Sequence, residues 1–175
     1  MLLLCREDFN SIPFINADGY HSKTIAYSIW HIFRIEDIVA HTVINEDEQV
    51  FFAGNYQERI NSPIITTGNE LIKQQIADFS KQLNLEELYS YIFEVRESTE
   101  KMLERLSYDE LKRKIPEERK GYLESLNVVN DNEKAIWLID YWCNKDICGL
   151  IQMPFSRHWI MHTEACLRIK NKIHS

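Results

Sequence analysis

Apolar residues recur along this chain mainly at spacings of three and four, which is the period of α-helices. No stretch alternates apolar and polar positions for long enough to indicate a strand, and only five glycines and four prolines interrupt the pattern. The pattern therefore predicts an all-α protein: an up-and-down bundle of about four long helices with short extra helices in the connections.

Three helices are predicted in the first two thirds of the chain. The most apolar one covers residues 22–44, with Ser22 as its N-cap, and we expect burial on nearly all of its sides. A second is expected to begin at Thr67, because residues 67–70 (TGNE) fit the capping-box pattern. A third is expected after Asn84, which can cap it, with apolar residues at bundle spacing as far as Leu106.

In the last third of the chain the sequence pattern predicts shorter helices and one long helix. Residues 107–110 (SYDE) form another capping box, which opens a short helix that Pro116 ends. Residues 116–132 are rich in Glu, Lys and Asn and indicate a solvated connection. A helix over residues 132–149 and a final helix from Pro154 to about Ile173 should then lie nearly end to end.

Length and charge narrow the class of protein. The 175 residues suit one domain, residues 1–175, and the net charge of −7 disfavours nucleic acid and acidic membrane surfaces as partners. The apolar start, MLLLC, meets the charged RED at once and is too short for an export signal or a spanning helix. We therefore expect a cytoplasmic protein whose four cysteines, with no Cys-x-x-Cys pair, are reduced.

The histidines suggest a metal site. His158 and His162 are four residues apart on a predicted helix, so both imidazoles face one point, and a third ligand must come from another helix. His31, inside the most buried helix, is the natural candidate, and we expect the three ligand nitrogens within about 4 Å of one another. His41 lies about 280° around the helix from His31 and should point elsewhere. Spacing alone leaves open a solvated histidine pair and a core histidine satisfied by hydrogen bonds.

Two segments carry a resemblance to a known family. Residues 24–37 (TIAYSIWHIFRIED) resemble the first metal-ligand helix of the DinB/YfiT-like superfamily. Residues 150–165 (LIQMPFSRHWIMHTEA) resemble its last helix, where a His-x-x-x-His pair completes the site, and residues 137–142 (WLIDYW) fit one subgroup. The resemblance covers both ends of the chain and the middle only through its helix pattern. It implies a four-helix bundle in which His31, His158 and His162 hold a divalent ion, zinc or nickel before manganese or iron.

The resemblance also implies candidate activities. Characterised relatives include thiol-dependent S-transferases and a thiol-dependent isomerase, which suggests a metal-dependent transferase or hydrolase acting with a small-molecule thiol. The alternative is a non-catalytic, metal-stabilised stress-response or interaction protein. An open pocket with polar groups around the metal favours the enzyme, and a closed four-coordinate site favours the alternative. The chain has no Gly-rich phosphate loop, nucleophile elbow or His-Glu-x-x-His run, which weakens nucleotide-binding and protease hypotheses.

Five further residues are candidates for supporting roles. Asp37 and Glu164 could hold a ligand imidazole from behind. Ion pairing among Arg34, Glu36 and Asp37 is the preferred interpretation of those charges. Arg157 is a candidate to bind a substrate carboxylate.

A homodimer is implied by the resemblance and has a physical argument of its own. Relatives usually have a full helix before the segment that matches residues 9–13, whereas only a short segment precedes it here. A helix as apolar as residues 25–39 cannot leave a broad face in water, so we expect a second copy of the chain to cover it. The competing account is that the helix from Trp137 to Gly149 folds back into the vacant position and closes a monomer.

Overall fold

The protein is helical throughout the part that the computed structural model describes, residues 4–175. Within that range no strand is formed, and one isolated bridge joins Lys114 to Asp146. The predicted all-α class is therefore confirmed. None of the described helices is long and apolar enough to cross a membrane, and the four cysteines are free thiols, as predicted.

A continuous helical rod runs through the middle of the molecule. It consists of α2 (Ile25–Asp37) and the π-helix η2 (Ile38–Asn45), and the predicted helix is confirmed over this length. Its N-cap is Thr24, whose Oγ1 accepts the N–H of Tyr27, and not Ser22 as predicted. Ser22 is engaged in the preceding turn, where its hydroxyl donates to a backbone carbonyl.

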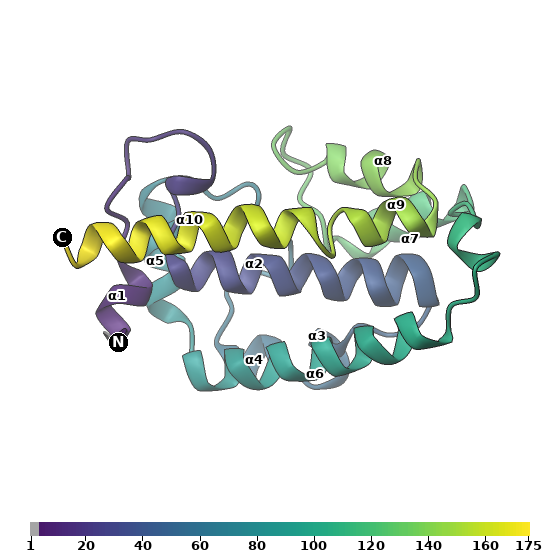
Figure 1. Cartoon of the computed structure of the whole chain (residues 1–175), viewed down its shortest axis with the longest axis horizontal. Coiled ribbons are helices and arrows are strands. Elements are labelled where there is room, and N and C mark those ends of the chain that lie inside the picture. Colours follow the sequence, from purple (N-terminus) through teal and green to yellow (C-terminus); the bar gives the residue numbers. More distant parts are fainter. Residues whose placement is uncertain (1–3) are drawn as a thin grey trace.

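Two other long helices flank this rod. Figure 1 shows α6 (Leu85–Arg105) along one side of α2 and α10 (Arg157–Ile173) along the other, with α10 antiparallel to α2. The predicted cap of α6 is confirmed, because Asn84 Oδ1 accepts the N–H groups of Glu86 and Glu87. The other elements of the described chain are short: α1 (Arg6–Asn10), η1 (Gly19–His21), α3 (Val50–Ala53), α4 (Tyr56–Ile60), α5 (Gln74–Gln82), η3 (Glu110–Lys112), α7 (Glu118–Leu126), α8 (Trp137–Cys143) and α9 (Ile147–Gln152).

The helix predicted to begin at Thr67 is wrong at its start. Gly68 has a φ of +77°, in the left-handed region that a right-handed helix cannot use, so residues 67–70 form a turn. The Glu70 carboxylate accepts the hydroxyl of Thr66 and makes no capping box with Thr67. The helical part of the prediction survives only as α5, which begins at Gln74.

Three predictions in the last third are corrected. The segment expected to be a solvated connection contains α7, whose Leu123 is fully buried. The helix predicted over residues 132–149 divides into α8 and α9, because Asp146 caps α9 by accepting the N–H of Gly149. The final helix begins at Arg157, not Pro154. The capping box at residues 107–110 is confirmed and opens η3.

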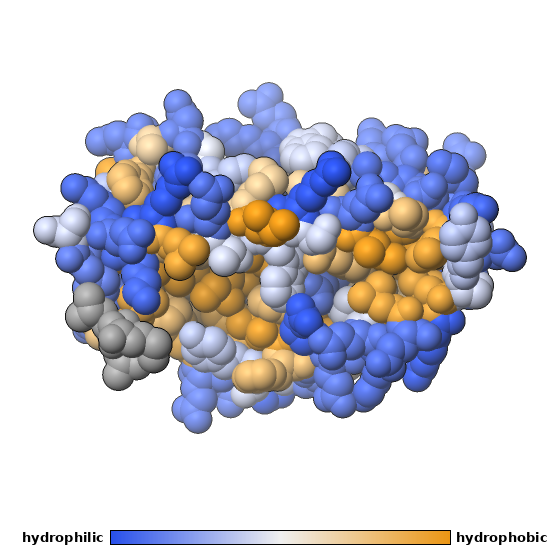
Figure 2. Space-filling model, viewed as in Figure 1, coloured by the Kyte–Doolittle hydropathy of each residue, from blue (hydrophilic) through white to orange (hydrophobic). Residues whose placement is uncertain are grey.

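The premise of the dimer prediction is wrong. Every residue of α2 except Ile29 is buried within a single chain. Part of the cover comes from α8, whose Leu138 and Trp142 share a buried cluster with Ile35 and Ile38, as in the competing account of a closed monomer. Figure 2 shows apolar side chains that remain visible along the face between α10 and α6. The homodimer stays a prediction that rests on the family resemblance.

Candidate metal centre

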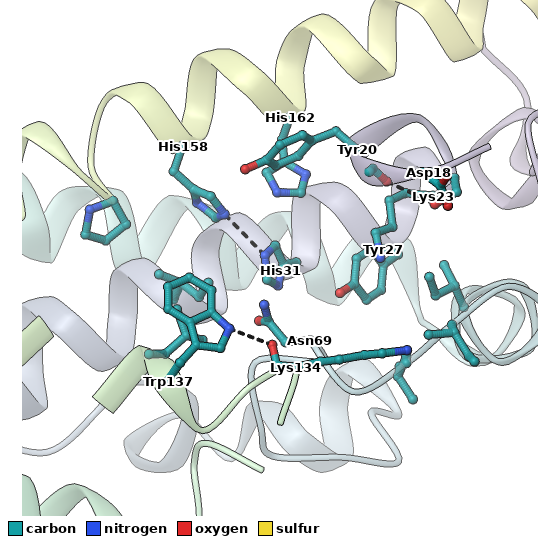
Figure 3. Close-up of a pocket in the computed structure, with 18 of the residues that line it drawn as sticks. Asp18, Tyr20, Lys23, Tyr27, His31, Asn69, Lys134, Trp137, His158 and His162 are labelled. Carbon is teal, nitrogen blue, oxygen red and sulfur yellow. Dashed lines mark hydrogen bonds between the residues drawn. The ribbon is translucent and has the colours of Figure 1, made fainter. Parts of the chain in front are cut away.

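Three buried imidazoles converge between α2 and α10. Figure 3 shows His31 from the middle of α2 facing His158 and His162, which lie one turn apart near the start of α10. Their ligand atoms all lie within 4.8 Å of one another, and the Nε2 atoms of His31 and His158 are 3.2 Å apart. The predicted convergence is confirmed, although the cluster is looser than the expected 4 Å or so.

A backbone carbonyl fixes the orientation of the His31 ring. His31 Nδ1 lies 2.6 Å from the carbonyl oxygen of Thr67, and since a carbonyl only accepts, Nδ1 carries the proton. The Nε2 lone pair is then directed at the other two histidines, which is the tautomer a metal ligand needs. Tyr27 supports the same turn: its ring stacks on His31 at 5.4 Å and its hydroxyl donates to the carbonyl of Gly68.

Burial keeps all three imidazoles neutral. It lowers the pKa of His31 well below its usual value and the pKa of His158 to about 4. The pKa of His162 is also lowered, first by burial and then by the neighbouring imidazoles. Each ring can therefore offer a lone pair at neutral pH.

The donor set fits a divalent ion. Two imidazole nitrogens bound tetrahedrally at about 2.0–2.1 Å lie about 3.3 Å apart, close to the separation of the Nε2 atoms of His31 and His158. The Nδ1 atoms of His158 and His162 are buried and have no hydrogen-bond partner among the described residues. Packing therefore orients the rings of His158 and His162. The ligand nitrogens of these two residues and of His31 converge on one point.

A cavity of about 660 Å³ opens over the cluster. The loop over residues 17–23, the start of α5, and parts of α8 and α10 form its wall. Tyr20 lies at the cluster, with its ring edge-on to His162 at 4.8 Å, and Trp137 also lines the cavity (Figure 3). Tyr141 packs beside Trp137 and completes an aromatic wall. The imidazoles therefore face a space that can hold a small molecule.

The carboxylates predicted behind the imidazoles lie elsewhere. Asp37 is fully buried, but it accepts the N–H groups of Val50 and Phe51 and contacts none of the ligand histidines. Glu164 is exposed and pairs with Arg168 at 2.5 Å. Both predictions are wrong, because the Thr67 carbonyl takes the role they were assigned, and a backbone carbonyl has no signature in the sequence.

The preferred ion-pair interpretation holds in part. Arg34 and Asp37 form a buried pair at 3.5 Å. Glu36 has a different role: it accepts the indole N–H of Trp159 at 2.9 Å, and burial raises its pKa to about 7. The Glu36 contact ties α2 to α10, whereas the Arg34–Asp37 pair lies within α2, and none of these residues lines the cavity.

Two other sequence predictions concern residues outside the cluster. His41 points away, as expected: its Nδ1 lies 2.7 Å from Asp47 and its Nε2 lies 2.9 Å from Ser98. Arg157 is exposed and does not line the cavity, so the prediction that it binds a substrate carboxylate is not supported. Tyr20 and Lys23 also line the cavity, and no signal in the sequence predicted them, because they come from a loop without a motif.

No protein-family model, curated protein or solved structure matches this chain. The resemblance to the DinB/YfiT-like superfamily therefore remains an expectation drawn from its residues.

Gly68→Ala is expected to damage the turn that orients His31. A Cβ at this left-handed position would lie 2.8 Å from the Trp30 ring and 3.1 Å from the Tyr27 ring. We expect the free energy of unfolding to fall by about 1–3 kcal/mol and metal affinity to fall about 10- to 100-fold, because the Thr67 carbonyl shifts. Denaturant unfolding and metal titration measure both effects.

Gly121→Ala is the matched control. A Cβ at Gly121, inside α7, meets nothing within 4 Å, so alanine should leave metal affinity unchanged and stabilise the helix by up to about 1 kcal/mol. Equal behaviour of the two variants would contradict the assigned role of the Gly68 turn.

Proposed function

We propose that this chain is a DinB/YfiT-like protein that holds zinc or nickel through His31, His158 and His162. The observation that carries the proposal is the set of three buried, neutral imidazoles with ligand atoms within 4.8 Å of one another. The arrangement of α2, α6 and α10 as three rods of a bundle supports the same family.

We propose further that the centre is catalytic and acts on a small-molecule thiol or water. The support is the cavity of about 660 Å³ over the imidazoles, since a purely structural ion is usually enclosed by four protein ligands. A divalent ion bound here would supply Lewis acidity to the thiol or water. Residues of the chain hold the imidazoles in place: the Thr67 carbonyl sets the tautomer of His31, Tyr27 stacks on the His31 ring, and Tyr20 packs against the His162 ring.

Thiol consumption tests the catalytic part of the proposal. Purified protein loaded with zinc or nickel is incubated with glutathione and an electrophile such as 1-chloro-2,4-dinitrobenzene, and loss of free thiol is followed. We expect turnover beyond one equivalent with the metal-loaded protein and background consumption with chelated protein and with His158→Ala. Metal binding without turnover across a panel of thiols and electrophiles would favour the non-catalytic alternative.

Chelation tests whether the ion also stabilises the fold. An ion that binds only the native state at about 100 times its Kd adds about 2.7 kcal/mol, which for a chain of this size is a shift of about 5–10 °C in the thermal midpoint. We expect chelator to lower the midpoint of the wild type by that amount and to leave His158→Ala unchanged. An equal shift in both proteins would show that the chelator acts at another place.

A further inference from the structure

The cavity over the imidazoles carries a charge opposite to that of the whole protein. Lys23, Lys73 and Lys134 line it, against a single acidic residue, Asp18. The side chains of the cavity therefore sum to a positive charge in a chain whose net charge is −7. A net negative charge does not account for a cavity wall that is positively charged, so this local excess of lysines needs its own explanation.

The three lysines are not neutralised within the described chain. None of them forms a salt bridge there. Lys23 is half-buried, with its ammonium 5.1 Å from the centre of the Tyr27 ring. Burial and the nearby Lys134 ammonium lower the pKa of Lys23. Two mutually repelling ammonium groups beside one cavity favour an anion between them.

The backbone at Lys73 is strained. Its φ of 46° and ψ of −115° lie in a region that residues with a side chain rarely adopt, directly before α5. Strain of this kind persists only where the surrounding structure enforces it, and it is common where a side chain must be placed for binding. The backbone of Lys73 is thereby held at the cavity wall, which its exposed side chain lines.

The rest of the cavity wall is largely aromatic and aliphatic. Trp137 and Tyr141 pack edge to face at 5.6 Å, and apolar side chains such as Leu138 and Met153 lie beside them. Aromatic and aliphatic surface of this extent binds the apolar body of a ligand, while charged groups select its head.

We propose that the cavity binds a small organic anion: an acidic group, carboxylate or phosphate, held by Lys23, Lys73 and Lys134, on an apolar body that packs against Trp137 and Tyr141. Any reaction of that anion rests on the proposed metal function, but its binding does not. The three imidazoles line the same cavity, so a molecule held by the lysines lies in the space that the imidazoles face.

A pair of probes with the same naphthyl body and a charged or a neutral head group tests the proposal. Binding of 2-naphthoate and of the neutral 2-naphthylmethanol to metal-free protein is measured by calorimetry at low ionic strength. We expect 2-naphthoate to bind about ten-fold more tightly, with a preference that shrinks as salt screens the charges. Lys23→Met should remove most of that preference and leave the alcohol unaffected, and Lys172→Met, at an exposed position of α10, should change neither.

Several outcomes would overturn the proposal. Equal affinity for the two probes would show that charge plays no part, and an equal loss of both in Lys23→Met would show that this lysine only packs. Loss of the preference in metal-free His158→Ala but not in Lys23→Met would assign the anion to the imidazoles. Failure of the metal proposal is distinguishable, because the wild type would then contain no bound ion and yet keep its preference for 2-naphthoate.

Discussion

His158→Ala is expected to lower metal affinity by more than about 100-fold, whereas His41→Ala leaves it close to that of the wild type. His158 offers its Nε2 atom to the cluster at 3.2 Å from that of His31, so alanine removes one of three ligands. His41 is also a buried histidine, but both its nitrogens are engaged with Asp47 and Ser98. Elemental analysis after dialysis against zinc or nickel measures the bound ion.

The two variants control for each other, because each removes a buried imidazole and each is expected to cost some stability. Comparing metal content at equal folded fraction, judged by circular dichroism, separates ligand loss from unfolding. Equal loss of metal in both variants would mean that a different residue supplies the third ligand. Full retention in His158→Ala would end the three-histidine assignment.

Local signals in the sequence were sufficient for part of the fold. The start of α6 was predictable because Asn84 and the two following N–H groups are close in sequence, and such a cap forms without help from the rest of the chain. The long apolar helix was predictable for the same reason, since its periodicity alone demands burial. The N-cap of α2 is Thr24 and not the predicted Ser22, because the Ser22 hydroxyl bonds to a carbonyl in the preceding turn.

Errors arose where tertiary contacts override local pattern. Residues 67–70 match a capping box, yet Gly68 adopts a left-handed conformation because its turn packs against Trp30 and Tyr27 and supports His31. The split between α8 and α9 depends on Asp146 acting as a cap, which lets α8 fold over η2. Neither the turn at Gly68 nor the break between α8 and α9 can be predicted from a few neighbouring residues alone.

In the candidate site, too, some features were predictable from the sequence and others depend on tertiary contacts. The His158–His162 spacing and the position of His31 in a buried helix, taken together with the family resemblance, predicted the three histidines that the structure brings together. The group that orients His31 was assigned to a carboxylate and proved to be the carbonyl of Thr67. The lysines of the cavity come from a loop, a strained turn and a segment before α8, so only the folded chain shows that they meet.

Asp37→Asn is expected to lower the free energy of unfolding by about 3–5 kcal/mol, a large part of the stability of a domain of this size. The carboxylate accepts the N–H groups of Val50 and Phe51 and the hydroxyl of Tyr91, each at 2.9 Å. An amide can present only one oxygen to these donors, so its NH₂ group must face a donor. Its neutrality also leaves the fully buried Arg34 without a counter-charge.

The partners of Asp37 offset part of the cost of burying its carboxylate. The pKa of Asp37 is raised overall, because burial outweighs the Arg34 guanidinium and the Phe51 N–H, which lower it. Tyr91→Phe removes one of the three donors and is expected to cost less, about 1–2 kcal/mol. Asp78→Asn, at an exposed position of α5, is the matched control and should stay within about 0.5 kcal/mol of the wild type.

The effect of Asp37→Asn should reach the candidate metal centre, although Asp37 does not contact the three histidines. Arg34 also donates from Nε to the carbonyl of Ile65 at 3.0 Å, two residues before Thr67, so Asp37 helps to position the segment that orients His31. We expect the variant to bind metal more weakly than Asp78→Asn when both are fully folded. Denaturant unfolding of metal-free protein and metal titration test the two parts separately. A loss of stability below about 1 kcal/mol would show that the buried pair is dispensable, and unchanged metal affinity would confine Asp37 to the core.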